Sequence, residues 1–382
     1  MKEIYKLSIV LIIDFLVLIW INNSLSISVY ELNELKENTL NGIYANFAYN
    51  IFGENYIRLA YIFLHILSNI FLYQISLKYL KKEIYLINIF FNLTPGVLAS
   101  ALLINPAGLI IFVSLLLIYL NLYKKKNTFY IALILSVFVD KAMLSFYIAC
   151  MIYAYFKRFN ILFFLSFFLF LIGIVINGYD FSGRPRGYFL DSLAIMAAVF
   201  SPPLFLYFFY TIYYTAFKGK KDLLFFVSAS AFIICLLLSF RQKPDIAEFL
   251  PFLVLSMPLI VSNFLNSFKV HLPQFRAKHK SILYFVSLSL IISYLFVVFS
   301  PFLYHFISYD EHFAKSYHLN KEIAKALKDK NIERISKNTN DFRVLEFYGI
   351  KPCYYDCKVL VPCDDGLIKI KFFMKEFQYC LR

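Results

Sequence analysis

The feature that most constrains this chain is a series of long apolar stretches between residues 5 and 304. A transmembrane helix needs about 20 predominantly apolar residues. Hydrophobic residues make up 60% of the sequence, which excludes a soluble globular domain and a disordered chain. The stretches are continuous and not alternating, which excludes a transmembrane barrel. We predict an all-α polytopic membrane protein with about 11 transmembrane helices, over 5–22, 57–77, 84–104, 107–123, 127–141, 142–156, 160–177, 191–217, 222–240, 249–268 and 281–304.

The basic residues of the connecting loops support this count. One alternating set of loops carries 17 Lys and Arg residues and the other carries 7. Cytoplasmic loops carry the excess of basic residues, so we predict a multi-pass protein of the cytoplasmic membrane with its N-terminus inside and its C-terminus outside. The same rule accounts for the net charge of +14, so we expect no nucleic-acid partner. The seven outer cations are Lys36, Arg58, Lys141, Arg184, Arg186, Arg241 and Lys243.

The first apolar stretch is expected to be a retained helix and not a cleaved signal peptide. It is about as long as a full span, Asp14 interrupts it, and no clear Ala-x-Ala site follows. Asp14 is also the only ionisable residue deep in a clear span, where a charge is costly unless it faces protein or water. A structural partner and a functional role are equally compatible with it.

Residues 305–382 are polar, and we expect them to form a small α/β module outside the membrane, separate from a membrane domain over 1–304. A helix is expected over 319–331, where apolar residues follow helical spacing. Cys353, Cys357, Cys363 and Cys380 favour one or two disulfides in an exported segment, with zinc as the alternative. Cys150 and Cys235 lie in apolar stretches and are expected to be buried.

The long first outer loop, 23–56, carries two features. Residues 40–52 place apolar side chains at helical spacing, which predicts an interfacial helix. Before it, Glu31, Glu34 and Glu37 lie next to the expected membrane surface. These acids fit a solvated helix start, or a carboxylate that serves as a general base or metal ligand. Glu31 and Glu34 share one helical face and are the candidate catalytic residues.

The outer cations are concentrated in short loops. The segment GYDFSGRPRGYFLD (178–191) carries Arg184 and Arg186, and SFRQKPDIAEF (239–249) carries Arg241 and Lys243. Arg and Lys bind phosphate through charge-assisted hydrogen bonds. With Arg58 at the start of the second stretch, these residues are candidates for binding a phosphate-linked substrate. Ordinary interfacial charge is the alternative.

Five segments resemble the GT-C class of membrane glycosyltransferases, specifically the family-39-like branch with the aminoarabinose lipid A transferases and protein mannosyltransferases. They are the acidic first loop VYELNELKE, the Arg-bearing GENYIRLAYIFLHILSNIFLYQISLKYL, the Pro-marked NIFFNLTPGVLASALLINPAGLIIFVSLLLIYL, the outer loop and paired prolines of GRPRGYFLDSLAIMAAVFSPPLFLYFFY, and SFRQKPDIAEFLPFLVLSMPLIVS. The sequence contains no Walker, GxGxxG, HExxH or GxSxG motif, so nucleotide hydrolysis and those hydrolase chemistries have no support.

The resemblance implies an inverting transfer of a sugar from a polyprenyl-phosphate donor to a lipid, glycan or protein acceptor of the cell envelope. It places the carboxylate that assists the acceptor at Glu31 first and Glu34 second. It assigns the donor phosphate to Arg58, Arg184, Arg186, Arg241 and Lys243. Family members usually carry an Asp-Glu pair in the first loop, where this chain has Tyr30-Glu31. A divalent metal is optional, because cations can stabilise the leaving phosphate alone.

Three other functions remain open at this stage. An O-antigen ligase or polymerase acts on similar lipid-linked glycans, but those enzymes concentrate function in one large loop between late spans, and no such loop is present. A lipid or solute transporter would need more intramembrane charge, broken helices and internal repeats. A non-catalytic membrane scaffold would use the chain to present its C-terminal module.

Overall fold

The computed structural model describes residues 2–178, 187–270, 273–309, 311–339, 341–353, 358–363, 366, 368–373 and 375–381. The chain divides into two compact units. Unit 1 comprises Met1–Leu16, Thr39–Asn41 and Ala60–Tyr294, and unit 2 comprises Val17–Asn38, Gly42–Leu59 and Leu295–Arg382. The division expected at residue 304 stays a prediction.

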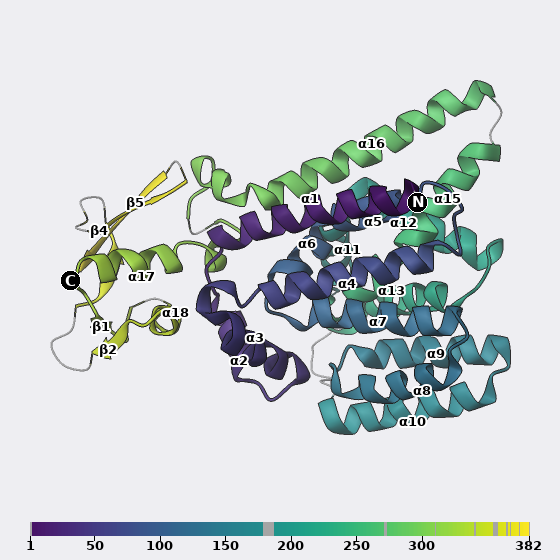
Figure 1. Ribbon diagram of the computed structural model, residues 1–382, viewed down its shortest axis with the longest axis horizontal. Coiled ribbons are helices and arrows are strands. Elements are labelled where there is room, and N and C mark those ends of the chain that lie inside the picture. The colour runs from purple at the N-terminus through teal and green to yellow at the C-terminus, as the bar shows by residue number, and fades with distance from the viewer. Residues whose placement is uncertain are drawn as a thin grey trace. The chain divides into compact units, whose positions relative to one another are not determined.

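Unit 1 consists of helices, several of which lie side by side with roughly aligned axes (Figure 1). Helix α9 contacts both α10 and α13. The helices are α1 (Lys2–Ser24, shared with unit 2), α4 (Leu59–Ser76), α5 (Tyr85–Asn92), α6 (Pro95–Leu102), α7 (Pro106–Leu122), α8 (Lys126–Leu135), η1 (Ser136–Phe138), α9 (Met143–Lys157), α10 (Asn160–Asn177), α11 (Phe189–Phe200), α12 (Pro202–Phe217), α13 (Leu223–Arg241), α14 (Ile246–Val254), α15 (Met257–Val270) and α16 (Pro273–Val298, shared with unit 2).

Five of these helices are long and apolar enough to cross a membrane, namely α1, α4, α10, α13 and α16. Three bent pairs raise the number of candidate spans in the described residues to eight: α5 with α6 (75°), α11 with α12 (105°) and α14 with α15 (42°). Helices α7, α9 and the segment Lys126–Phe138 are apolar but shorter. The chain is therefore a helical membrane protein with five to eight candidate spans, and the count of 11 stays a prediction.

A proline lies at each of the three bends, including Pro258 as the second residue of α15. Pro95 and Pro202 occupy the first turns of α6 and α12. Proline has no backbone N–H and fits the first helical turn, so each residue starts a new helix and ends the preceding one. Ser201, at the break before α12, has a positive φ of 77°. The expected spans 127–141 and 142–156 correspond to α8 with η1 and to α9, and Asp140 and Lys141 lie between them.

Large apolar side chains on the surface of α10 fit lipid contact. Val175 is 83% exposed and Ile161 is 73% exposed, on a helix of 18 residues. A soluble protein rarely exposes an apolar patch of this extent. Inside unit 1, by contrast, Phe146 and Phe252 are fully buried and pack with ring centroids 6.3 Å apart.

Unit 2 combines the loop between the first two expected spans with the C-terminal segment. Its two sheets are a parallel pair, β1 with β2, and an antiparallel sheet in the order β3-β5-β4. Strand β4 alternates buried Ile368, Ile370 and Phe372 with exposed lysines, and α17 packs on it. The elements are α2 (Val29–Lys36), α3 (Leu40–Tyr56), η2 (Ser300–His305), η3 (Lys315–Tyr317), α17 (Asn320–Asp329), β1 (Arg334–Ser336), α18 (Phe342–Phe347), β2 (Lys351–Cys353), β3 (Leu360–Pro362), β4 (Ile368–Phe372) and β5 (Lys375–Leu381).

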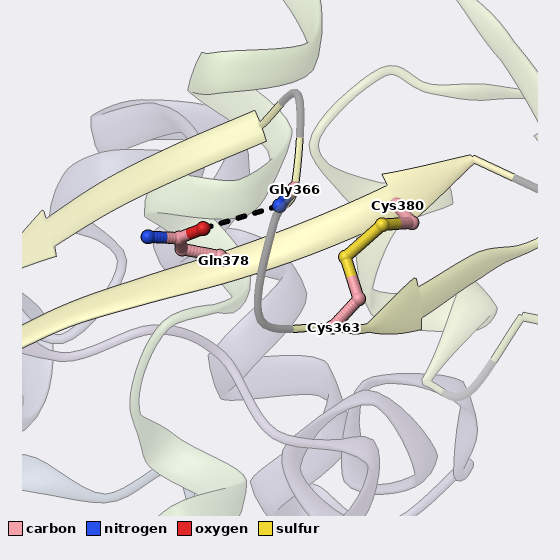
Figure 2. The surroundings of a disulfide bond; sticks show 4 residues. All are labelled: Cys363, Gly366, Gln378 and Cys380. Carbon is pink, nitrogen blue, oxygen red and sulfur yellow. Dashed lines mark hydrogen bonds between the residues drawn. A yellow bond between two sulfur atoms is a disulfide. The ribbon is translucent and has the colours of Figure 1, made fainter.

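A disulfide links Cys363, next to β3, to Cys380 in β5 (Figure 2). The Cα atoms are 5.8 Å apart, and Gly366 N nearby donates a hydrogen bond of 3.1 Å to Gln378 Oε1. The prediction of a disulfide in this segment is confirmed, and these two sulfurs are not zinc ligands. Cys353 is also disulfide-bonded, whereas Cys357 lies outside the described residues. Cys150 and Cys235 are free and buried, as expected.

Helix α3 extends over and beyond the expected interfacial helix 40–52. Ile43, Phe47 and Ile51 follow one another at intervals of four residues and are 61%, 60% and 56% exposed. Ala45 and Ala48 are fully buried on another side. The helix therefore packs through its small residues and leaves its large apolar side chains uncovered within the described structure. It bends at Gly53, where a φ of 72° favours glycine.

Candidate functional site

Glu31 is held at the start of α2 by a reciprocal pair of hydrogen bonds with Ser28. The Ser28 side chain accepts from Glu31 N at 3.2 Å, and Glu31 Oε2 accepts from Ser28 N at 2.9 Å. This is the capping box, which satisfies backbone donors that a helix start otherwise leaves unpaired. Glu31 is 2% exposed, so its carboxylate is fixed in place and shielded from solvent.

Arg58 is the second partner of this carboxylate. Its Nε donates to Glu31 Oε1 at 3.3 Å, and its Nη2 donates to Glu31 Oε2 at 2.7 Å. The remaining guanidinium contacts are backbone oxygens, Leu25 O at 3.2 Å and Ser26 O at 2.8 Å. Arg58 is 3% exposed. We call this arrangement the Glu31–Arg58 pair; it joins the end of α3 to the loop that precedes α2.

The C-terminal segment completes the surroundings of this pair. Tyr348 Oη accepts from Ile27 N at 2.9 Å, and Tyr317 O accepts from Ser26 N at 2.8 Å. Burial raises the pKa of both tyrosines, and the negative charge of Glu31 raises it further. Burial also lowers the pKa of Lys321, an effect that Glu322 opposes and Arg58 reinforces.

Half-buried Glu54 lies close enough to influence two of these groups. Its charge partly offsets the lowering of the Lys321 pKa by burial, and it adds to the rise of the Tyr348 pKa that burial causes. Unit 2 thus gathers carboxylates, cations and phenols around the segment between the first two expected spans. The pKa values of Tyr317, Lys321 and Tyr348 are shifted, chiefly by burial, and shifted titratable groups that gather in this way are candidates for a functional site.

The geometry limits what Glu31 can do in this state. Three N–H groups, one from Ser28 and two from Arg58, point at its carboxylate. Three of the roughly four lone-pair sites of the carboxylate are therefore occupied, and movement of Arg58 would free two of them. Arg58 presents a planar fork of donors, which matches a phosphate as well as a carboxylate.

The other predicted site residues are distributed as follows. Glu34 lies one turn further along α2 and is half-buried. Arg241 ends α13 and Lys243 follows in the turn before α14; both are exposed and belong to unit 1. Arg184 and Arg186 lie outside the described residues. Of the seven predicted residues, the structure brings Glu31 and Arg58 into contact.

Unit 1 has its own polar cluster near Arg241 and Lys243. Lys141 Nζ lies 2.7 Å from Glu248 Oε1, and Asp245 caps α14 by accepting from Ala247 N at 3.1 Å. Lys243 and Asp245 line an open pocket of about 430 Å³. Lys141, one of the seven predicted outer cations, is therefore paired with a carboxylate of α14.

Asp14 has a partner that the sequence analysis missed. His65 Nε2, on α4, lies 3.0 Å from Asp14 Oδ2 and 3.1 Å from Asn69 Nδ2. Asn88 Nδ2, on α5, donates to Asn69 O and Asn69 Oδ1 at 2.9 and 3.0 Å. These four buried side chains, the Asp14–His65 network, link α1, α4 and α5 inside unit 1.

Two of the missed features had a signal in the sequence. Ser28-x-x-Glu31 has the spacing of a capping box, which assigns Glu31 a structural role. His65 and Asn69 stand one turn apart in an otherwise apolar stretch, which marks a polar stripe facing other helices. Lys321 and Glu54 carried no comparable signal, because their positions depend on contacts between distant segments.

Within the described residues, no group of three or more His, Cys, Asp or Glu side chains is placed to hold a metal ion. No protein-family model matches the chain, and no curated protein matches it in sequence.

Proposed function

We propose that the chain is a glycosyltransferase of the cytoplasmic membrane that transfers a sugar from a polyprenyl-phosphate donor to a lipid, glycan or protein acceptor at the outer face. The observation that carries the proposal is the Glu31–Arg58 pair, in which a candidate base and a candidate phosphate ligand lie 2.7 Å apart directly after the first span. The resemblance of the sequence to family-39-like transferases supplies the reaction class.

The proposed mechanism begins with an exchange of partners at Arg58. The donor phosphate takes over the guanidinium N–H groups that now hold Glu31, and the Glu31 carboxylate is released. The acceptor hydroxyl then attacks the anomeric carbon, its proton passes to Glu31, and the bond from that carbon to the phosphate oxygen breaks with inversion. Arg58 stabilises the charge that develops on the leaving phosphate. Glu34 is the alternative base.

The proposed topology has eleven spans. The five long helices, three bent pairs and three shorter apolar helices coincide with the eleven apolar stretches. The alternation of basic loops supports a cytoplasmic N-terminus, and the Cys363–Cys380 disulfide supports an oxidising compartment for the C-terminal segment. Thiol labelling of a cysteine introduced at Ser308 in intact cells tests this orientation; protection from the reagent would reverse it.

The activity test compares a deletion strain with strains complemented by wild type, Glu31→Gln or Glu34→Gln. Mass spectrometry of surface glycans and lipids is expected to show the loss of one sugar mass, restored by wild type and Glu34→Gln and not by Glu31→Gln. Glutamine still accepts the Ser28 N–H in the capping box, so the substitution removes charge and keeps the cap. Restoration by Glu31→Gln with failure of Glu34→Gln would transfer the role to Glu34. An unchanged glycan profile in the deletion strain would refute the transferase.

A transporter is the second candidate, and the Asp14–His65 network is the observation that favours it. Ionisable residues within spans often mark ion or substrate pathways, and discontinuous helices resembling the three bent pairs occur at transporter binding sites. The two functions differ in what Asp14→Asn does: the transferase retains its glycan product, whereas a proton-coupled transporter loses uptake in membrane vesicles.

A further inference from the structure

We propose that unit 1 binds one acyl chain of an anionic phospholipid in a cavity between α5, α12, α15 and α16. The binding site is independent of the transferase proposal, because it lies in a different part of the molecule, whereas its assignment to the inner leaflet rests on the proposed topology. The proposal is argued from the chemistry of the cavity wall, its opening to the surface and the cations on the helix ends beside it.

The cavity has a volume of about 160 Å³ and is almost entirely apolar. Of its twelve lining residues, Tyr207 and Ser287 carry polar side-chain groups. An apolar protein cavity of about 150 Å³ stays dry and takes up a hydrocarbon of benzene size. The volume is too small for a helix of another protein, and it fits a short segment of a narrow hydrocarbon chain.

The cavity reaches the surface of unit 1 along α16. Ile282 lines it and is 44% exposed, whereas Val286, one turn further along the helix, is 9% exposed. Helix α15 contacts both α5 and α12 on the other sides. A chain can therefore enter beside Ile282 and extend towards Val286.

Lysines flank the end of the cavity where Ile282 lies. Lys280 precedes the lining residue Ile282 by two residues on α16. Lys269 follows the lining residue Leu265 by four residues on α15, which is about 6 Å along the helix axis. Lys82 precedes the lining residue Leu86 by four residues. All three lysines are exposed. Basic residues at the ends of helices that enclose an apolar groove are suited to an anionic head group.

The nearby acids do not cancel this charge. Glu3 accepts from Ile84 N at 3.2 Å and pairs with Lys6 at 3.8 Å. Glu83 is exposed next to Lys82. Lys6 Nζ also lies 4.6 Å from the ring centre of Tyr85, at the start of α5. This end of the cavity keeps an excess of positive charge, which favours an anionic over a zwitterionic head group.

The proposed topology places these lysines on the cytoplasmic side, opposite the proposed transfer reaction. We therefore assign the cavity to a glycerophospholipid of the inner leaflet and not to the polyprenyl donor. The two lipids share a phosphate head and a hydrocarbon tail, so the test must distinguish them.

The test is a lipid titration of the purified full chain, followed by native mass spectrometry. The probes are dioleoylphosphatidylglycerol, dioleoylphosphatidylcholine and a polyprenyl phosphate. We expect one phosphatidylglycerol to bind about tenfold more tightly than phosphatidylcholine, and polyprenyl phosphate to fail to displace it. Equal binding of the two phospholipids, or displacement by polyprenyl phosphate, would overturn the proposal.

A double variant and a matched control connect the lipid to this cavity. Lys269→Gln with Lys280→Gln is expected to abolish the preference for phosphatidylglycerol. Lys124→Gln with Lys125→Gln removes the same charge from the exposed turn after α7, which does not line the cavity, and is expected to change binding less than twofold. A similar loss in both double variants would show a general surface effect and refute the site.

A photoactivatable group at the end of the acyl chain provides a second readout that needs no folding-sensitive variant. Peptides from α15 and α16 are expected to carry the crosslink, and Leu265→Trp is expected to reduce it by filling the cavity. Crosslinks confined to α10, whose surface is also apolar, would contradict the assignment.

Discussion

Each unit buries one carboxylate, Glu31 in unit 2 and Asp14 in unit 1, and the two carboxylates have different kinds of partner. In unit 2, Glu31 faces the permanent charge of Arg58 and a backbone N–H within its own helix cap. In unit 1, Asp14 faces His65, whose charge is not permanent, and the polar contacts continue through Asn69 to Asn88. The first arrangement fixes one charge pair, whereas the second spreads a polar contact over three helices. Removal of a partner should therefore lower the free energy of unfolding more in unit 2 than in unit 1.

The largest effect is expected from breaking the Glu31–Arg58 pair. Glu31→Gln leaves the buried Arg58 without its counter-charge, which typically costs about 3–5 kcal/mol of unfolding free energy. Arg58→Gln should cost a similar amount. The measurement is thermal or denaturant unfolding in detergent, followed by the emission of Trp20, the single tryptophan, which contacts Phe299 within unit 2.

The double variant Glu31→Gln with Arg58→Gln separates stability from catalysis. It removes both charges, so we expect most of the stability to return while sugar transfer stays lost. If transfer returned together with stability, the pair would be purely structural. If stability stayed as low as in the single variants, hydrogen bonding and not charge would be the dominant contribution.

Acid is expected to produce the next largest effect, also in unit 2. Burial and, to a smaller extent, the charge of His312 together lower the pKa of His318 from its ordinary value of 6.5 to about 3. Between pH 3 and pH 6.5 the unfolded state therefore binds more protons at this histidine than the folded state does. The contribution of His318 to the free energy of unfolding is fully present above pH 6.5 and is lost as the pH drops towards 3. The loss should reach about 2 kcal/mol over two pH units below 6.5.

His318→Gln provides the check on the source of this acid sensitivity. His318 Nδ1 lies 3.1 Å from Tyr304 Oη, and glutamine can keep a polar contact there without gaining a charge in acid. The variant should show a flatter pH profile of the unfolding free energy. An unchanged profile would assign the sensitivity to His312, whose pKa burial also lowers.

Sequence patterns were sufficient for features that depend on neighbouring residues. Apolar stretches located the helices, and cysteines in an exported segment predicted a disulfide, but the bends within three of the expected spans were not predicted. The partners of buried charges required contacts between distant positions, such as Glu31 with Arg58 and Asp14 with His65. Glu31 illustrates the limit, because its residue type suggested a general base while its hydrogen bonds depend on the path of the whole loop. The assigned roles of Glu31, Glu34, Arg58, Arg241 and Lys243 stay predictions.

A smaller effect is expected from the Asp14–His65 network. Asp14→Asn keeps a polar side chain facing His65, and polar contacts between helices in membranes contribute about 1 kcal/mol each. The melting temperature in detergent should therefore fall by much less than for Glu31→Gln. Asp14→Leu removes the contact altogether and should lie between the two. A loss for Asp14→Asn as large as that for Glu31→Gln would mean that both units depend on full charge pairing.

The smallest effect is expected from the Lys141–Glu248 ion pair of unit 1, which is accessible to solvent, unlike the buried Glu31–Arg58 pair of unit 2. Lys141 is 42% exposed and Glu248 is 20% exposed, so water screens much of their attraction even though the atoms lie 2.7 Å apart. Exposed ion pairs contribute about 0–1 kcal/mol, and added salt weakens them. Lys141→Gln should therefore lower the unfolding free energy by less than about 1 kcal/mol. Raising the salt from about 0.05 M to about 0.5 M shortens the Debye length about threefold and should abolish the difference. A salt-insensitive loss comparable to that of Glu31→Gln would show that distance, and not burial, decides what an ion pair contributes in this protein.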